Sequence, residues 1–201
     1  MTSEPNGKTT LQTLRETTER LVAEKGCQST TIRDIVNRTG VSMGGIYHYV
    51  KSKDELFGLI LQARIEEIDR RFREAVSRAA CGDLHSPLHV IVDGFLRLIA
   101  EETQVFRKVL LYLVSRQENP EIAKVLSDFH AKWREICETW IEAGKTGGAI
   151  PAALPAQEAS SLLVTFYLGV LIESSLSVTG QSKQRILRFT EGVLTQPQRL
   201  E

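Results

Sequence analysis

Residues 31–56 read TIRDIVNRTGVSMGGIYHYVKSKDEL, and this stretch governs how the rest of the chain is interpreted. Thr31 followed by Asp34 fits the start of a helix, because each side chain can accept the backbone N–H of the other. Gly40 fits the end of that helix, since glycine adopts a positive φ without steric cost. Ser42 then caps a second short helix. Two short helices joined by a tight glycine turn predict a helix-turn-helix.

The residues around this motif predict a small head of three helices. We expect these helices at residues 10–25, 32–39 and 43–49. A second capping pair, Ser52 with Glu55, opens a long fourth helix. The expected core of the head consists of Ile32, Ile35, Val36, Val41 and Ile46. In a helix-turn-helix, the second helix of the motif enters the major groove of DNA.

The motif resembles that of the TetR family of bacterial transcriptional regulators. The matching residues, in register and without gaps, are Thr31, Ile35, Gly40, Val41, Ser42, Gly44, Tyr47, Tyr49, Lys53 and Leu56. Cys27 departs from the family pattern, in which this position is often aromatic. The close resemblance covers the N-terminal quarter, and the remainder fits in length and helical pattern. It implies an all-α fold of about nine helices, with a DNA-binding head and a helical body that binds a ligand and dimerises.

Three regions are expected from this pattern. Residues 1–8 form a flexible tail, residues 9–54 the helix-turn-helix domain, and residues 55–201 the effector-binding and dimerisation domain. The fourth helix, which begins near residue 53, links the last two regions.

Proline and capping residues mark the later helices. Asn119 before Pro120, and Ser86 before Pro87, each read as an N-cap followed by the first helical residue. The expected helices of the body lie at residues 53–80, 87–102, 103–116, 120–143, 156–178 and 183–195.

Phosphate contacts fix the register of a protein on the duplex, and several polar side chains of the motif suit that role. Tyr47 and Tyr49, beside His48 and ahead of Lys51 and Lys53, form a row of donors, and the resemblance implies phosphate contacts for Tyr47 and Lys53. Thr31 and Arg33 lie at the start of a helix, where backbone N–H groups also favour anions. Burial of both tyrosines in the core is the alternative.

Only a few side chains of the predicted recognition helix can contact base edges. Gly44 and Gly45 allow the backbone to approach DNA closely, but they carry no side chain to read bases. Met43 can contact a thymine methyl group, and His48 can bond to a base edge or a phosphate. A solvated surface position is the alternative for His48. The predicted DNA-binding set is Thr31, Arg33, Ser42, Met43, Gly44, Gly45, Tyr47, His48, Tyr49 and Lys53.

The resemblance implies a ligand cavity inside the body. An apolar pocket with few polar groups is the usual form of such a site, although plain core packing is the alternative for each residue. The candidate lining residues are Phe72, Phe95, Ile99, Phe106, Leu110, Phe129, Trp133, Cys137, Trp140, Phe166 and Tyr167. Glu173 and His130 are candidate orienting contacts. We expect a hydrophobic or aromatic small molecule as effector.

Residues 162–172 are apolar nearly all round, so a helix there must be covered on two sides. In the family the last two helices pair with those of a second copy. The candidate interface residues of a homodimer are Leu162, Phe166, Val170, Glu173, Ile186, Phe189 and Val193. Complete burial inside a monomer is the alternative.

Composition restricts the other classes of function. The chain has 25 basic and 25 acidic residues, whereas residues 33–53 carry four basic residues against one acidic, so any nucleic-acid contact must be local. The longest apolar run, residues 159–172, is shorter than the roughly 20 residues that span a bilayer. We therefore expect a soluble, cytoplasmic protein without membrane contact.

No metal or cofactor is expected. The three cysteines are widely separated and lack metal-ligand spacing. His85 and His89 are four residues apart, but a helix beginning at Pro87 would leave His85 outside it.

The expected function is therefore that of a ligand-responsive transcriptional regulator and not an enzyme. We expect a repressor that binds a palindromic operator as a dimer and is released by the effector. Two alternatives remain: a helical enzyme with a cysteine or histidine centre, and a protein-interaction scaffold whose head does not function.

Overall fold

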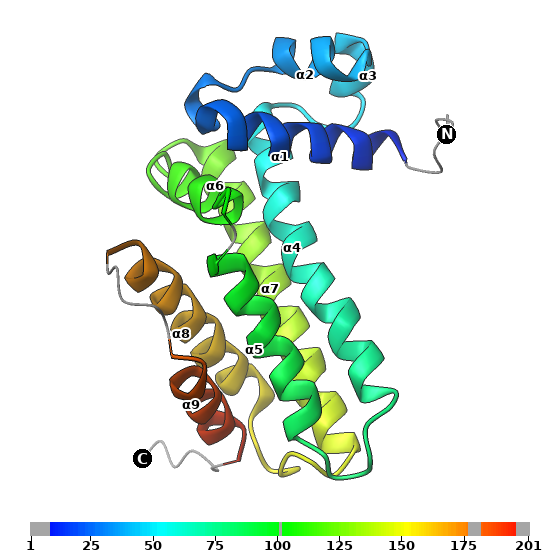
Figure 1. Ribbon diagram of the computed structural model, residues 1–201, viewed down its shortest axis with the longest axis vertical. Helices are drawn as coiled ribbons and strands as arrows, with labels where there is room; N and C mark the ends of the chain where they lie inside the picture. Colours follow the sequence, from blue (N-terminus) through cyan, green and yellow to red (C-terminus); the bar gives the residue numbers. More distant parts are fainter. Residues whose placement is uncertain (1–8, 101, 177–181, 196–201) are drawn as a thin grey trace. The chain divides into compact units, whose positions relative to one another are not determined.

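A computed structural model describes residues 9–100, 102–176 and 182–195 (Figure 1). These residues form nine α-helices and no strand, in agreement with the all-α prediction. The helices are α1 (Thr10–Ser29), α2 (Ile32–Thr39), α3 (Met43–Tyr47), α4 (Lys53–Val76), α5 (His85–Ala100), α6 (Val105–Val114), α7 (Pro120–Thr146), α8 (Ala156–Leu176) and α9 (Lys183–Thr195). The predicted tail and the predicted breaks at Gly180 and Pro197 lie outside the described residues.

Several helix ends differ from the prediction. α3 ends at Tyr47, two residues early, and α4 ends at Val76, four residues early. α5 begins at His85, so the prediction that Ser86 caps it was wrong. The carboxylate of Asp83 accepts the N–H of Ser86 at 3.0 Å, which places the cap upstream of the proline.

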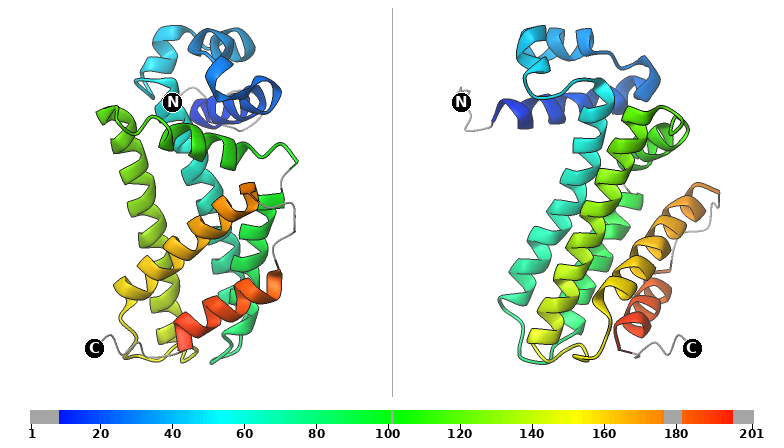
Figure 2. Two further views of the ribbon diagram at one scale, coloured as in Figure 1. Left: turned by 90° about the vertical axis from the view of Figure 1, so that its left-hand side faces the viewer. Right: turned by 180° about the vertical axis from the view of Figure 1, so that it is seen from behind.

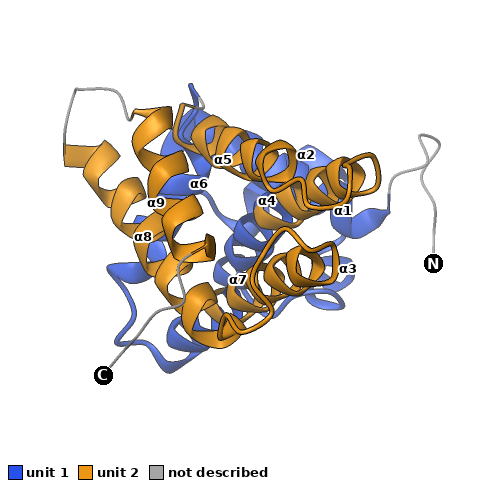
Figure 3. Ribbon diagram, turned by 90° about the horizontal axis from the view of Figure 1, so that it is seen from below, with its two compact units in different colours: residues 1–64, 101–129 blue, residues 65–100, 130–201 orange. Residues whose placement is uncertain are grey.

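The chain divides into two compact units (Figure 3). Unit 1 comprises residues 1–64 and 101–129, and unit 2 comprises residues 65–100 and 130–201. Both α4 and α7 therefore contribute residues to each unit. The domain boundary at residue 54 stays a prediction, because compact units do not show which part folds alone.

Unit 1 is built around the predicted head. α1, α2 and α3 enclose a core whose buried members are Leu14, Leu21, Ile35, Ile46, Val50 and Leu56. Ile32, Val36 and Val41, which were also predicted, are partly buried against it. α6 packs against α1 within the same unit (Figure 1).

Unit 2 combines α5, α8 and α9 with the later parts of α4 and α7. α8 and α9 lie side by side, and α9 also packs against α5 (Figure 2). The rings of Phe95 and Tyr167 meet with centroids 4.5 Å apart. Gly94 permits close approach of α5 to α4, because a Cβ there would lie 2.9 Å from Cγ1 of Ile68.

α8 has 21 residues and is longer than the apolar run seen in the sequence. Among the described helices it alone is long and apolar enough to cross a bilayer, a test that core helices of soluble proteins also pass.

Candidate nucleic-acid interface and ligand cavity

The helix-turn-helix is held by local capping. Thr31 N–H donates to Oδ2 of Asp34 at 2.8 Å, and Asp34 N–H donates to Oγ1 of Thr31 at 3.2 Å. Gly40 has φ of 72° and donates its N–H to the carbonyl of Val36 at 2.8 Å. Oγ of Ser42 accepts the N–H of Gly45 at 3.1 Å. The predicted turn chemistry of the motif is therefore confirmed.

Charge reinforces the first of these caps. The ammonium of Lys25 lies 2.7 Å from Oδ2 of Asp34. Hydrogen bonding to Lys25, and then to Thr31, lowers the pKa of Asp34 to about 2. The capping carboxylate therefore stays ionised in all but strongly acidic solution.

Most of the predicted DNA-binding side chains lie on the surface of unit 1. Tyr47 is 50% exposed and Tyr49 is 41% exposed, so burial of these rings in the core is excluded. The ring of His48 contacts that of Tyr49 edge-on, with centroids 5.2 Å apart. The exposed members of the set are Thr31, Arg33, Ser42, Met43, Gly44, Tyr47, His48 and Tyr49.

The two glycines of α3 have different surroundings. A Cβ at Gly44 would meet nothing within 4 Å, whereas at Gly45 it would lie 3.0 Å from Cγ1 of Val41. Gly45 therefore packs inward and Gly44 faces open space.

Lys53 is half-buried and already has partners within unit 1. Its ammonium donates to the carbonyl oxygens of Cys27 and Thr30, both at 3.0 Å, and of Gln28 at 3.3 Å. Sequence reasoning missed these contacts, because the residues involved are more than 20 positions apart.

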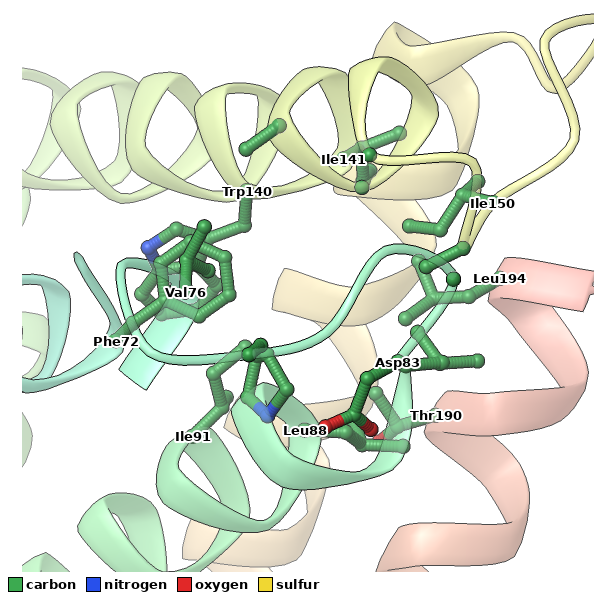
Figure 4. A pocket seen from close by; sticks show the side chains of 18 of the residues that line it. Phe72, Val76, Asp83, Leu88, Ile91, Trp140, Ile141, Ile150, Thr190 and Leu194 are labelled. Carbon is green, nitrogen blue, oxygen red and sulfur yellow. The ribbon is translucent and has the colours of Figure 1, made fainter. Parts of the chain in front are cut away.

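Unit 2 contains a partly open cavity of about 330 Å³ (Figure 4). Its lining residues come from the loops α4–α5 and α7–α8 and from helices α4, α5, α7, α8 and α9. The rings of Phe72 and Trp140 lie at one end, and Asp83 and Thr190 at the other (Figure 4). Of the predicted lining residues, Phe72, Cys137, Trp140 and Tyr167 line it.

The other predicted ligand residues lie elsewhere. Phe106, Leu110 and Phe129 are buried in unit 1. Phe95, Ile99, Trp133 and Phe166 belong to unit 2 but do not line the cavity. The predicted orienting groups of His130 and Glu173 do not line it either.

Sequence reasoning missed the loop residues that close this cavity, including Asp83, Leu84, Gly147 and Ile150. Aromatic residues in a helical pattern indicate core, but they do not indicate where the core is incomplete. The glycines and alanines of residues 79–82 and 143–149 were the available signal, because small side chains leave space.

The cavity wall is apolar with few polar groups. The hydroxyl of Thr190 donates to the carbonyl of Ile186 at 2.9 Å, so its oxygen accepts from the hydroxyl of Tyr167 at 3.1 Å. Burial raises the pKa of Tyr167 and that of Cys137. Both groups are therefore neutral, which suits an apolar guest with a single polar end.

The outer surface of α8 and α9 carries exposed apolar side chains. Leu162 and Phe189 are exposed, and the rings of Phe166 and Phe189 stack with centroids 3.8 Å apart. Glu173 pairs with Arg185 at 3.2 Å. The remaining predicted interface residues, Val170, Ile186 and Val193, are buried inside unit 2. Ile172 and Leu176, which were not predicted, are exposed on α8.

His85 lies inside α5, so the prediction that the helix begins at Pro87 and leaves His85 outside it was wrong. In the described part of the chain, no group of three or more histidine, cysteine, aspartate or glutamate side chains could hold a metal ion.

Residues 14–60, which contain the capped and exposed motif, match the model of the bacterial regulatory proteins of the TetR family. The head of this chain is therefore similar to the DNA-binding domain of the TetR family.

Individual relatives agree with this assignment. The chain is 25% identical over 129 residues to the transcriptional repressor KstR2 of Rhodococcus jostii, a match that covers 62% of this chain and 61% of KstR2. It is 23% identical over 162 residues to the regulator EthR of Mycobacterium tuberculosis, covering 81% of this chain and 74% of EthR. A structure of a putative TetR-family regulator from Syntrophomonas wolfei has the same fold, with a TM-score of 0.66 and 18% identity over 90% of this chain and 91% of the other.

Proposed function

We propose that this chain is a ligand-responsive repressor of the TetR family that binds a palindromic operator as a homodimer in the cytoplasm. One observation carries the proposal: Arg33, Tyr47 and His48 are exposed on the head, and a Cβ at Gly44 of α3 would meet nothing within 4 Å. Folding of the core does not require these polar groups at the surface. Contact with phosphates and base edges of DNA does require them there.

A salt series on DNA binding tests this proposal. A duplex selected from a random pool by the protein should bind more weakly as salt rises, with a log–log slope of about −0.9 for each neutralised phosphate. Tyr47→Phe should weaken binding to all sequences, whereas Met43→Ala should change the preferred sequence. Failure to select any duplex would refute the proposed function.

The small size of the head and the apolar surface of unit 2 both support dimerisation. One short recognition helix reads too few base pairs for specificity, whereas a two-fold dimer reads two half-sites about 34–36 Å apart. The apolar surface of α8 and α9, with Leu162, Ile172 and Phe189, supplies a suitable interface.

The cavity of unit 2 is the proposed effector site. Its volume and its rings fit a small hydrophobic or aromatic molecule, and Asp83 or Thr190 can accept a hydrogen bond from one polar end. Phe72 and Trp140, whose ring centroids are 5.4 Å apart, offer faces on which a planar guest can pack.

α4 provides the route from cavity to head, because Lys53–Arg64 belong to unit 1 and Phe72 and Val76 line the cavity. A guest that binds better to one orientation of α4 shifts the population of head spacings. By linkage, bound DNA must lower the affinity for the guest by the same factor by which the bound guest lowers the affinity for DNA. Equal affinity of the guest with and without operator would refute this coupling.

A protein-interaction scaffold and an enzyme are the competing functions. Both predict that Tyr47→Phe leaves the principal activity unchanged. Loss of duplex binding in this variant, with folding intact, would exclude them.

A further inference from the structure

Lys53 contacts a part of α1 where helical hydrogen bonding stops. Gly26 has φ of 80°, which kinks the end of α1, and Thr30 is the C-cap. The last carbonyls of a helix lack partners within it, and a cation nearby is favourable. Lys53 supplies the missing donors at the corner that leads into α2.

A lysine ammonium has three N–H donors, and three carbonyl oxygens use all of them. The ammonium also lies close to two aromatic rings. Nζ lies 5.8 Å from the ring centroid of Phe57 and 5.4 Å from that of Tyr112. Both rings lie within the range of a cation–π interaction.

Tyr112 belongs to α6 and is itself fixed. The guanidinium of Arg116 lies 5.2 Å from its ring, and Nη1 donates to its hydroxyl. The Tyr112 ring also meets that of Phe57 edge-on, with centroids 5.5 Å apart. The Lys53 ammonium therefore joins the end of α1, the start of α4 and α6, all within unit 1.

We propose that Lys53 is a positioning residue that locks the corner between α1 and α2 onto α6, rather than a phosphate ligand. To donate to a phosphate, its ammonium would have to give up at least one of these three carbonyl oxygens. Lys51, two residues earlier, is exposed and needs no such change. The link of this role to DNA rests on the proposed function.

The first test does not use DNA. Cys27 is buried at the corner, whereas Cys81 is exposed. In a Cys81→Ser background, the rate at which DTNB labels Cys27 reports opening of the corner, with mass spectrometry to assign the labelled cysteine. Lys53→Met should raise this rate about tenfold or more, since hydrogen bonds to a charged group are lost. The matched control Lys51→Met should leave it unchanged. Equal rates in both variants would overturn the proposal.

Two further variants separate charge from geometry. Lys53→Arg keeps the charge, but a planar fork cannot direct three N–H groups at one cage of carbonyls, so Cys27 should again become reactive. Tyr112→Phe keeps the ring and loses only the hydrogen bond to Arg116, so it should raise Cys27 labelling less than Tyr112→Leu does. If Cys27 stayed protected in both Lys53→Arg and Tyr112→Leu, the proposed positioning role of Lys53 would be contradicted.

The second test uses a duplex selected from a random pool by the wild-type protein. Lys53→Met should weaken binding about tenfold while the slope of log affinity against log salt stays unchanged. A slope smaller by about 0.9 would show that Lys53 neutralises a phosphate, and would overturn the proposal. If the wild type selects no duplex, the proposed function fails, and the Cys27 experiment still decides the role of Lys53.

Discussion

Asp34 shows how single side chains fix the start of α2. Its pKa is lowered to about 2 mainly by hydrogen bonding to Lys25, so Lys25→Met should raise that pKa more than Thr31→Val does. Carbon-detected NMR titration of the Asp34 carboxyl in the three proteins measures this. A larger effect of Thr31→Val would contradict the order of causes.

The same carboxyl gives stability a defined dependence on pH. Because the pKa of Asp34 is lower in the folded chain, its contribution is present above the ordinary value of about 3.9 and is lost as pH falls through about 2. The difference in unfolding free energy between wild type and Asp34→Asn should therefore be constant at neutral pH and shrink in that acidic window. Urea unfolding of both proteins across this pH range measures the difference in unfolding free energy. A difference that does not change with pH would show that the pKa of Asp34 is not lowered.

Gly44 and Gly45 form a matched pair. Gly44→Ala should stabilise the free head by up to about 1 kcal/mol, because alanine is the better helix former and nothing lies within 4 Å. Gly45→Ala should destabilise it, because the new methyl group would press on Val41 and Ser42.

Thermal unfolding and duplex affinity distinguish packing from recognition in these two variants. If Gly44 faces DNA, Gly44→Ala should weaken binding although it stabilises the fold. Unchanged affinity would show that this face of α3 does not approach the duplex.

Local chemistry made parts of the site predictable. Thr31, Gly40 and Ser42 act on neighbours three or four residues away, so sequence spacing alone determines their roles. Lys53 could not be understood in this way, because its partners come from α1 and α6. Val170 and Val193 likewise carry no local sign of which side of a helix faces inward.

Among the elements, the contact of α4 with α7 in unit 1 depends on Gly58. A Cβ there would lie 2.5 Å from Cγ1 of Val125. Gly58→Ala should therefore destabilise the chain by about 1–3 kcal/mol through overpacking. Adding Val125→Ala should restore part of the loss by making room. Urea unfolding measures both variants, and an additive loss in the double variant would exclude a direct clash.

Whole helices were predicted better than their ends. α2 and α9 begin and end as expected, because capping residues and periodic apolar positions agree there. α5 begins earlier, because the carboxylate of Asp83, and not the side chain of Ser86, caps its first turn. Position of the cavity was not predictable, because it depends on how two loops meet in space.

At the scale of the whole molecule, we propose that the exposed apolar surface of α8 forms the interface of a homodimer. Ile172→Glu should convert a dimer into a monomer, because a charge would be buried in an apolar interface. Val114→Glu on α6 is the control, since Val114 is 42% exposed and Ile172 is 41% exposed. Light scattering after gel filtration would contradict the proposed interface if both variants stayed dimeric.

Cavity filling tests the effector site. Because Val76 lines the cavity, the larger side chain of Val76→Phe should occupy part of it. The affinity for the effector should therefore fall, while the affinity for the operator stays unchanged. Val90→Phe is the control, since Val90 is also half-buried but does not line this cavity. Calorimetric titration with an effector would refute the site if Val76→Phe bound it as tightly as the control.

The positions of the two tryptophans provide a practical means of finding that effector. Both Trp133 and Trp140 belong to α7 within unit 2, and the indole N–H of Trp140 donates to Asp69 at 2.8 Å beside the cavity. The helix-turn-helix contains no tryptophan. Intrinsic emission of the unlabelled protein should therefore respond to a molecule entering the cavity, which makes a compound library directly screenable by fluorescence.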